Sequence, residues 1–309
     1  AFWVQYQVMP NNLEVPEMKV FSLRNYIIFS LLLLVRLIAT ADYVAFQAGT
    51  ASLTCDSSDP LVITMDISVR SQQIKSFGAS DCWTIQNVGN WPEDKATAIA
   101  DLLFSTALDE NGQPKGIGLS LWRMNRGAGS SRQNNISDPW RRADCFLDEA
   151  MADYDWQRCS GQRKFLQLAK SRGVAHFTAF CNSPVINMTR NGNAFCDPSV
   201  GTTNLDFAKA DDFSRYLADV LVHFRDAEGI NFDCISPVNE PEWDWNQNRS
   251  NPPRAGQEGC RYNNADIKRL VDALYPQLQS RGLETEIEVC ESGNIEYIYS
   301  NGDEKGNHA

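Results

Sequence analysis

A unit of helix, glycine and strand recurs three times along the chain, and this repeat constrains the fold more than any other feature. The glycines are Gly173, Gly229 and Gly282, each placed between a polar helix end and an apolar run. A glycine there closes a helix in the left-handed conformation before the chain enters a strand. Alternating helices and strands favour a parallel sheet with right-handed crossovers. The repeat therefore predicts an α/β fold.

Short apolar runs predict five strands, and apolar residues at helical spacing predict the helices between them. Five strands cannot close a barrel, which takes about 250 residues and eight repeats. We therefore predict a (β/α)8 TIM barrel of which about the first five βα repeats are present. Residues 51–70 alternate polar and β-branched side chains, which predicts part of an accessory β-structure. The five predicted strands are residues 74–80, 118–124, 175–181, 232–238 and 286–290.

The fourth predicted strand delivers one carboxylate into a group of aromatic residues. Glu240 follows that strand, and Pro241 ends it because proline has no N–H for the ladder. In a β/α barrel the C-terminal ends of the strands form the catalytic face. Trp243 and Trp245 follow and offer flat apolar surfaces of the kind that stack on pyranose rings. The alternative is that Glu240 is one more solvated acid in a loop.

Four motifs follow one another along the chain, each at the end of a predicted strand. They are SFGASDCW at 76–83, LSLWRMNRGAG at 119–129, FCNSP at 180–184 and ISPVNEPEWDW at 235–245. Together they resemble glycoside hydrolase family 30 and, within it, the endo-β-1,6-galactanase-like branch, over about residues 61–298. The resemblance implies a retaining hydrolase on a β/α barrel with a side β-domain.

The resemblance also implies roles for single residues. Glu240 would be the general acid/base, and Asn239 would bind the sugar 2-hydroxyl. A retaining glycosidase needs one carboxylic acid that protonates the leaving oxygen and a second carboxylate about 5 Å away. Burial and the charge of the second acid would raise the pKa of Glu240 and keep it protonated.

Further substrate contacts are expected at the ends of the first three strands. Arg123 resembles the family arginine that holds the nucleophile ionised, with a surface salt bridge as the alternative. Trp83 resembles a family tryptophan against which the sugar ring packs, and the alternative is that it is an aromatic residue of the core. Asn182 and Ser183 are candidates for contacts with substrate hydroxyls.

The nucleophile is expected to be absent from this chain. In the resembling family it is a glutamate at the end of the seventh barrel strand, and the sequence predicts strands one to five only. Glu291 also ends a strand on the catalytic face. We interpret it as a cleft-lining, hydroxyl-binding residue, and the alternative is that it is the nucleophile. We expect these residues alone to be inactive.

The N-terminal part of the chain has a secretory pattern. Lys19 and Arg24 precede an apolar run over residues 27–38, and Ala39 and Ala41 form a small-residue cleavage site. The run is shorter than the roughly 20 residues that span a bilayer, so a membrane anchor is the weaker alternative. We predict an extracellular protein. Its predicted segments are 1–17 (upstream, non-native translation), 18–41 (signal peptide), 42–73 (accessory β-structure) and 74–309 (incomplete catalytic barrel).

The cysteine and histidine content bears on the compartment and on metals. Nine cysteines fit an oxidising space, and we expect Cys145 and Cys159 to form a disulfide. His176, His223 and His308 show no ligand spacing, so no metal and no cofactor are expected.

The net charge of −11, without charged blocks, argues against nucleic acid and anionic membranes as partners. We expect a monomer that acts on a polysaccharide, with β-1,6-galactan or arabinogalactan side chains favoured. One alternative is a related family 30 xylanase or glucanase. The other is a non-catalytic carbohydrate-binding protein that keeps Trp83, Trp243 and Trp245.

Overall fold

A computed structural model divides the chain into two compact units, Ala1–Val4 with Ser76–Ala309, and Gln5–Lys75. In the second unit, β2 (Thr50–Leu53) pairs antiparallel with β3 (Ile63–Asp66). These strands lie where the alternating pattern predicts β-structure, while the segment boundaries stay predictions. The structure describes residues 2–6, 50–53, 63–66, 73–200, 203–243, 245 and 251–299, so the predicted signal peptide lies outside the described residues.

The larger unit is built on a sheet whose strands follow the order of the chain, β1-β4-β5-β6-β7-β8. Each pair from β4 to β8 is parallel, with partners such as Ser80↔Arg123 and Phe180↔Ser236. Parallel strands in chain order require crossover connections, which the helices supply. The strands are β1 (Phe2–Tyr6), β4 (Ile74–Ser80), β5 (Leu121–Asn125), β6 (His176–Phe180), β7 (Cys234–Ser236) and β8 (Glu286–Ile287).

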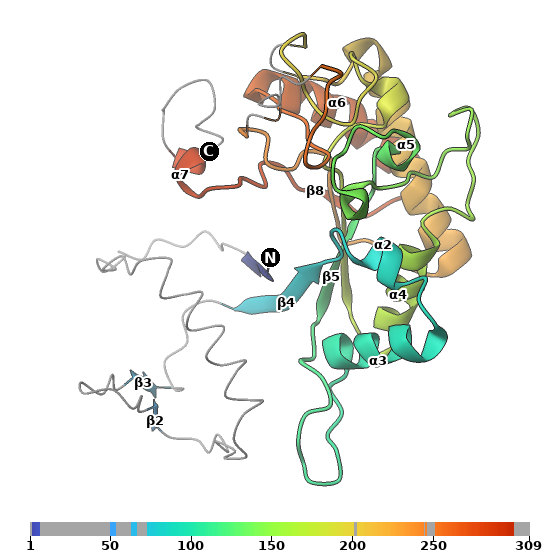
Figure 1. The fold of residues 1–309 in the computed structure, drawn as a ribbon. Helices are drawn as coiled ribbons and strands as arrows, with labels where there is room; N and C mark the ends of the chain where they lie inside the picture. Colours follow the sequence, from blue (N-terminus) through green and yellow to red (C-terminus); the bar gives the residue numbers. More distant parts are fainter. Residues whose placement is uncertain are drawn as a thin grey trace. The chain divides into compact units, whose positions relative to one another are not determined.

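Each crossover in the larger unit contains one long helix, and Figure 1 shows α3, α4 and α5 gathered on one side of the strands. These helices are α3 (Glu93–Phe104), α4 (Ser160–Ser171), α5 (Ala210–His223) and α6 (Asn264–Ser280). The short helices are α2 (Ile85–Val88), η1 (Ser130–Arg132), η2 (Pro139–Arg141), η3 (Ile186–Met188), η4 (Phe207–Lys209), η5 (Phe224–Glu228) and α7 (Glu296–Tyr299).

The core lies between the sheet and these helices. Trp122 on β5 is buried between α3 and α4, with its ring 5.0 Å from that of Phe104 and 6.5 Å from that of Phe165. Aromatic pairs of this kind contribute about 1 kcal/mol each beyond the area they bury. The apolar residues predicted at helical spacing are confirmed as core on α5, η5 and α6, except that Val271 on α6 is only partly buried. Buried members are Phe213, Leu217, Val220, Leu221, Phe224, Ile267, Leu270, Leu274 and Leu278.

The repeat of helix, glycine and strand is confirmed. Gly173, Gly229 and Gly282 have φ angles of 85°, 65° and 61° and precede β6, β7 and β8. The predicted parallel α/β fold is therefore correct, and the number of eight repeats stays a prediction. Within the described residues, no helix has both the length and the apolar character needed to cross a bilayer.

Four of the five predicted strands are longer than the observed ones, and the last two differ most. The run 232–238 forms only Cys234–Ser236. Its C-terminal end is set by Pro237, which has no N–H to continue the ladder, and the prediction that Pro241 ends the strand is wrong. The run 286–290 forms only Glu286–Ile287, and Cys290 has a φ of 61°, which turns the backbone away from extended geometry. Both strands still end where the sequence predicts functional side chains.

A close approach of two backbones fixes the loop after β4. Gly89 at the end of α2 lies against Gly161 in the first turn of α4, and a Cβ on Gly89 would be 2.1 Å from the Gly161 carbonyl oxygen. A Cβ on Gly161 would be 2.6 Å from the carbonyl oxygen of Gln86. Only glycine allows this contact, which positions α2 and the preceding Trp83.

Candidate active site

The C-terminal ends of the parallel strands bring the predicted site residues together. Arg123 lies on β5, Asn182 follows β6, Asn239 and Glu240 follow β7, and Glu291 follows β8. Parallel strands end at a common edge, so residues far apart in the chain meet there. The structure joins these five side chains or their backbones through hydrogen bonds.

Arg123 is the centre of this network. Its Nε donates to Glu291 Oε1 at 2.9 Å, and its Nη2 donates to Glu291 Oε2 and, at 2.9 Å, to Asn239 Oδ1. The guanidinium carbon lies 3.2 Å from the centroid of the Phe180 ring. The two charged side chains are only 8% and 4% exposed. This burial does not fit the surface salt bridge that was the alternative for Arg123.

Three asparagine side chains extend the hydrogen-bond network of Arg123. Asn239 Nδ2 donates to Asn182 Oδ1 at 3.0 Å, and Asn182 Nδ2 donates to Asn125 Oδ1 at 3.2 Å. Each amide therefore orients the next. Asn182 is buried by these partners, so its predicted contact with substrate stays a prediction. The Ser183 hydroxyl is also buried and donates to the carbonyl oxygen of Pro184.

Glu240 has an unusual backbone conformation at the end of β7. Its φ is 46°, in the left-handed region that non-glycine residues rarely adopt, and such strain is concentrated at functional sites. Its N–H donates to the carbonyl oxygen of Glu291 at 2.9 Å. Its own carbonyl accepts from Trp243 N at 3.1 Å and from Trp245 Nε1 at 3.2 Å. The surroundings therefore hold this conformation from two sides.

The environment of Glu240 favours its protonated form. Burial raises the pKa of this carboxyl, and the negative charges of Glu242 and Glu291 raise it further, while Arg123 opposes them. The group is half-buried, so it keeps access to a ligand. A carboxyl group with a raised pKa keeps its proton to higher pH and can donate it in catalysis.

Sequence reasoning missed two acids beside the predicted site. Glu242 is buried, and its Oε1 accepts hydrogen bonds from Ser292 Oγ at 2.8 Å and from the Gly293 N–H. Burial and the neighbouring Glu291 raise the pKa of Glu288 to about 7. Glu242 stands inside the motif at 235–245, and Glu288 stands in the fifth predicted strand, so their positions were the available signal.

The aromatic residues differ in their exposure. Trp243 is 46% exposed, whereas Trp83 and Trp245 are half-buried. The ring of Trp245 packs against Gly259, where a Cβ would lie 2.1 Å from its Cδ2. Trp243 is therefore the tryptophan of this group best exposed for stacking on a sugar.

The prediction of a disulfide between Cys145 and Cys159 is wrong for this structure. Both are free thiols, as are the other described cysteines. The Cys145 thiol is buried and donates to Met151 Sδ at 3.9 Å, while Cys159 precedes α4 with a left-handed φ of 54°. No cluster of three or more metal-ligating side chains occurs among the described residues.

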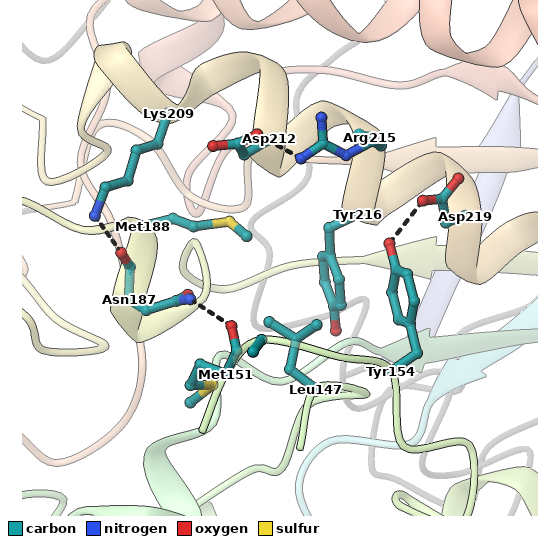
Figure 2. A pocket seen from close by; sticks show the side chains of 11 residues that line it. Leu147, Met151, Tyr154, Asn187, Met188, Lys209, Asp212, Arg215, Tyr216 and Asp219 are labelled. Carbon is teal, nitrogen blue, oxygen red and sulfur yellow. Dashed lines mark hydrogen bonds and ion pairs between the residues drawn. The ribbon is translucent and has the colours of Figure 1, made fainter. Parts of the chain in front are cut away.

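A pocket of about 290 Å³ lies away from these residues, beside α5 (Figure 2). Some of its polar groups pair with one another: the Tyr154 hydroxyl donates to Asp219 at 2.7 Å, and Lys209 Nζ donates to the Asn187 carbonyl at 2.6 Å. The pocket contains none of the predicted site residues, so we do not assign the chemistry to it. It is lined by Leu147, Met151, Ala152, Tyr154, Asn187, Met188, Lys209, Asp212, Arg215, Tyr216 and Asp219.

Comparison with known proteins decides the family. Residues 60–309 match the model of O-Glycosyl hydrolase family 30. The chain belongs to this family. The resemblance to family 30 that the four motifs predict is thus confirmed.

Similar proteins agree with the family 30 assignment. The chain is 30% identical over 225 residues to an endo-beta-1,6-galactanase of Hypocrea rufa, covering 68% of this chain and 44% of that protein. It is 34% identical to a conserved exported protein from Bacteroides fragilis, with a TM-score of 0.71 over 78% of this chain and 48% of that chain. SrfJ from Salmonella typhimurium shares the fold at 20% identity, with a TM-score of 0.53 over 71% of this chain and 44% of that chain. The family 30 chain therefore spans less than half the length of these relatives.

Proposed function

We propose that this protein is a retaining glycoside hydrolase in which Glu240 is the general acid/base. The observation that carries the proposal is the position of Glu240, half-buried at the end of β7, with burial and neighbouring acids raising its pKa. A protonated carboxyl at a strand end can donate to the oxygen of a glycosidic bond. Asn239, oriented by Arg123 and Asn182, would hydrogen-bond the sugar beside it.

The proposed reaction has two steps. In the first, Glu240 protonates the leaving oxygen while a second carboxylate attacks the anomeric carbon. In the second, Glu240, now ionised, takes a proton from water, which releases the sugar from the second carboxylate. We propose that the second carboxylate is a glutamate on a later strand, outside this chain. Glu291 follows β8 and forms a bridge with Asn239, directly before Glu240; Arg123 binds both of its carboxylate oxygens, and we assign it to lining the cleft.

We propose a β-1,6-linked galactan as substrate and the extracellular space as the location. The 30% identical relative named endo-beta-1,6-galactanase supports the substrate. The exposed face of Trp243 supports a sugar ligand. The basic residues, apolar run and small-residue site within 18–41 support secretion. We also propose that the protein acts as a monomer.

Glu240→Gln in the full-length protein tests the acid/base role. We expect hydrolysis of β-1,6-galactan to fall by more than about 1,000-fold, since general acid catalysis contributes up to about 10⁴-fold. Binding of galacto-oligosaccharides, measured by calorimetry, should persist. Glu110→Gln, an exposed acid far from the site, is the matched control and should keep full activity. Unchanged turnover in Glu240→Gln would show that Glu240 is not the acid/base. The substrate is tested by comparing the hydrolysis of β-1,6-galactan by the unaltered protein with that of β-1,4-xylan and β-1,6-glucan.

Azide rescue tests whether Glu291 is the nucleophile or whether the nucleophile is a glutamate outside this chain. In a retaining enzyme, azide rescues an acid/base variant with retention and a nucleophile variant with inversion, because it attacks from opposite faces. We expect Glu240→Ala to yield the retained glycosyl azide and Glu291→Ala to yield no inverted azide. An inverted azide from Glu291→Ala, identified by NMR, would make Glu291 the nucleophile.

A further inference from the structure

Two buried cysteines face each other between the segment after β6 and the segment after β7. Phe195 and Gly259 form a parallel bridge, and the Gly259 N–H donates to the Ala194 carbonyl at 2.9 Å. The next residues in this register are Cys196 and Cys260. Neighbouring strands lie about 4.8 Å apart, within the Cα separations of about 4.4–6.8 Å that a disulfide spans.

Both thiols bind the backbone of the same residue. The Cys260 thiol donates to the Arg261 carbonyl oxygen at 3.5 Å, and the Arg261 N–H donates to Cys196 Sγ at 3.4 Å. The two residues are 1% and 0% exposed. The hydrogen bond from Cys260, with that of the Arg261 N–H, lowers the pKa of the Cys196 thiol, and burial raises that of Cys260. Cys196 therefore has the more readily formed thiolate, which is the nucleophile in thiol–disulfide exchange.

We propose that Cys196 and Cys260 form a disulfide that ties the segment after β6 to the segment after β7. The oxidant is a small disulfide such as oxidised glutathione. The exchange takes place while the chain folds, before packing covers the two thiols: the Cys196 thiolate attacks the oxidant and releases one glutathione thiol, and Cys260 then displaces the second. Two S–H bonds and the oxidant's S–S bond are lost, one protein S–S bond forms, and two glutathione thiols carry away the two electrons and two protons.

The bond would fix the segment on which Trp245 rests. Gly259, directly before Cys260, packs against the Trp245 ring. Glu258, one residue earlier, is buried and accepts hydrogen bonds from the N–H groups of Ala128 and Ser130. A covalent bond at Cys260 would therefore hold both contacts. This inference rests on the packing alone and stands whether or not the proposed function is correct.

Peptide mapping tests the pairing directly. The full-length protein is prepared in an oxidising secretory host, alkylated while denatured and digested with trypsin. Cys196 and Cys260 then fall in separate peptides, 191–209 and 255–261, each with one cysteine. We expect these peptides to be joined, with a mass about 2 Da below the sum of the two free thiol peptides. Recovery of both as alkylated, unlinked peptides, or linked to other cysteines, would overturn the proposal.

Stability provides a second readout. We expect Cys196→Ser and Cys260→Ser each to lower the Tm of the oxidised protein by roughly 5–10 °C, and the double variant by no more than either. Cys145→Ser, a buried thiol outside the pair, is the matched control and should leave the linked peptide in place. If a single variant fails to fold, the peptide map of the unaltered protein still shows whether Cys196 and Cys260 are linked. Additive losses in the double variant would contradict a shared bond.

Discussion

Arg123 binds Glu291 with two nitrogens across a sheet in which β6 and β7 separate their strands. Three strand spacings of about 4.8 Å would hold these side chains apart on a flat sheet. The contact at 2.9 Å therefore requires the sheet to curve toward the side of the site. Curvature of this kind gathers the strand ends around one point, and Glu240 lies at that point.

Replacement of Arg123 by lysine should reduce activity. Lysine cannot reproduce the two parallel hydrogen bonds to Glu291 or the third to Asn239. We expect kcat/KM to fall by about 100-fold, because a displaced Asn239 misplaces the substrate. Arg158→Lys is the control, since that arginine pairs with Asp144 outside the site. Equal activities of the two variants would show that Arg123 has no part in positioning.

The charge of Glu242 should set the pH range of activity. Burial raises the pKa of Glu240 first, and the negative charge of Glu242 raises it further. Glu242→Gln removes that charge and keeps the acceptor for Ser292. The pKa of Glu240 then falls, so the acid form is lost at lower pH. We expect the alkaline limb of the kcat/KM profile to move down by about 1 pH unit or less.

An unmoved alkaline limb in Glu242→Gln, with normal folding by circular dichroism, would contradict this coupling. Glu149→Gln serves as the control because its carboxylate pairs with Arg158 on an exposed surface. That variant should leave the whole profile in place.

Buried acids should make the folded state less stable as the pH rises. Burial raises the pKa of Glu258 from 4.5 to about 7. The folded state therefore binds a proton more tightly than the unfolded state, and its stabilisation is full below pH 4.5. This contribution is lost as the pH rises through 4.5 to about 7, on the order of 3 kcal/mol at most.

Urea denaturation between pH 4 and pH 8 measures this effect. We expect Glu258→Gln to flatten the fall in unfolding free energy across that range. Asp81, whose pKa burial raises to about 7, should contribute in the same direction and remain in the variant. A slope that is the same in Glu258→Gln and the unaltered protein would show that this carboxyl does not bind the proton.

The contact between Gly259 and Trp245 should matter for ligand binding. A Cβ at residue 259 would lie 2.1 Å from Trp245 Cδ2, so Gly259→Ala must displace the ring. We expect weaker binding of oligosaccharides by about tenfold, measured by calorimetry, because ring stacking is lost. Gly256→Ala is the matched control, since nothing lies within 4 Å of its Cβ position. Equal affinities would remove Trp245 from the binding surface.

The residue pattern predicted the position of the site better than its internal contacts. Gly173, Gly229 and Gly282 mark strand starts, so the strand ends, with Arg123 and Glu240, follow from chain order. That these ends meet is a general property of parallel sheets.

The contacts among these side chains could not be predicted in the same way. Arg123 and Glu291 are 168 residues apart in the chain, and no local pattern indicates which acid an arginine selects. Glu242 and Glu258 read as ordinary charged residues in loops, and only tertiary packing buries them. The expected pairing of Cys145 with Cys159 failed for a related reason, because proximity in sequence does not set the direction of two thiols.

The contact of Gly89 with Gly161 ties the position of Trp83 to helix packing. Because α2 and α4 touch backbone to backbone there, a larger side chain at either glycine would push the two helices apart and move the loop that carries Trp83. A change in the position of this tryptophan can therefore begin behind its loop, in the layer of helices.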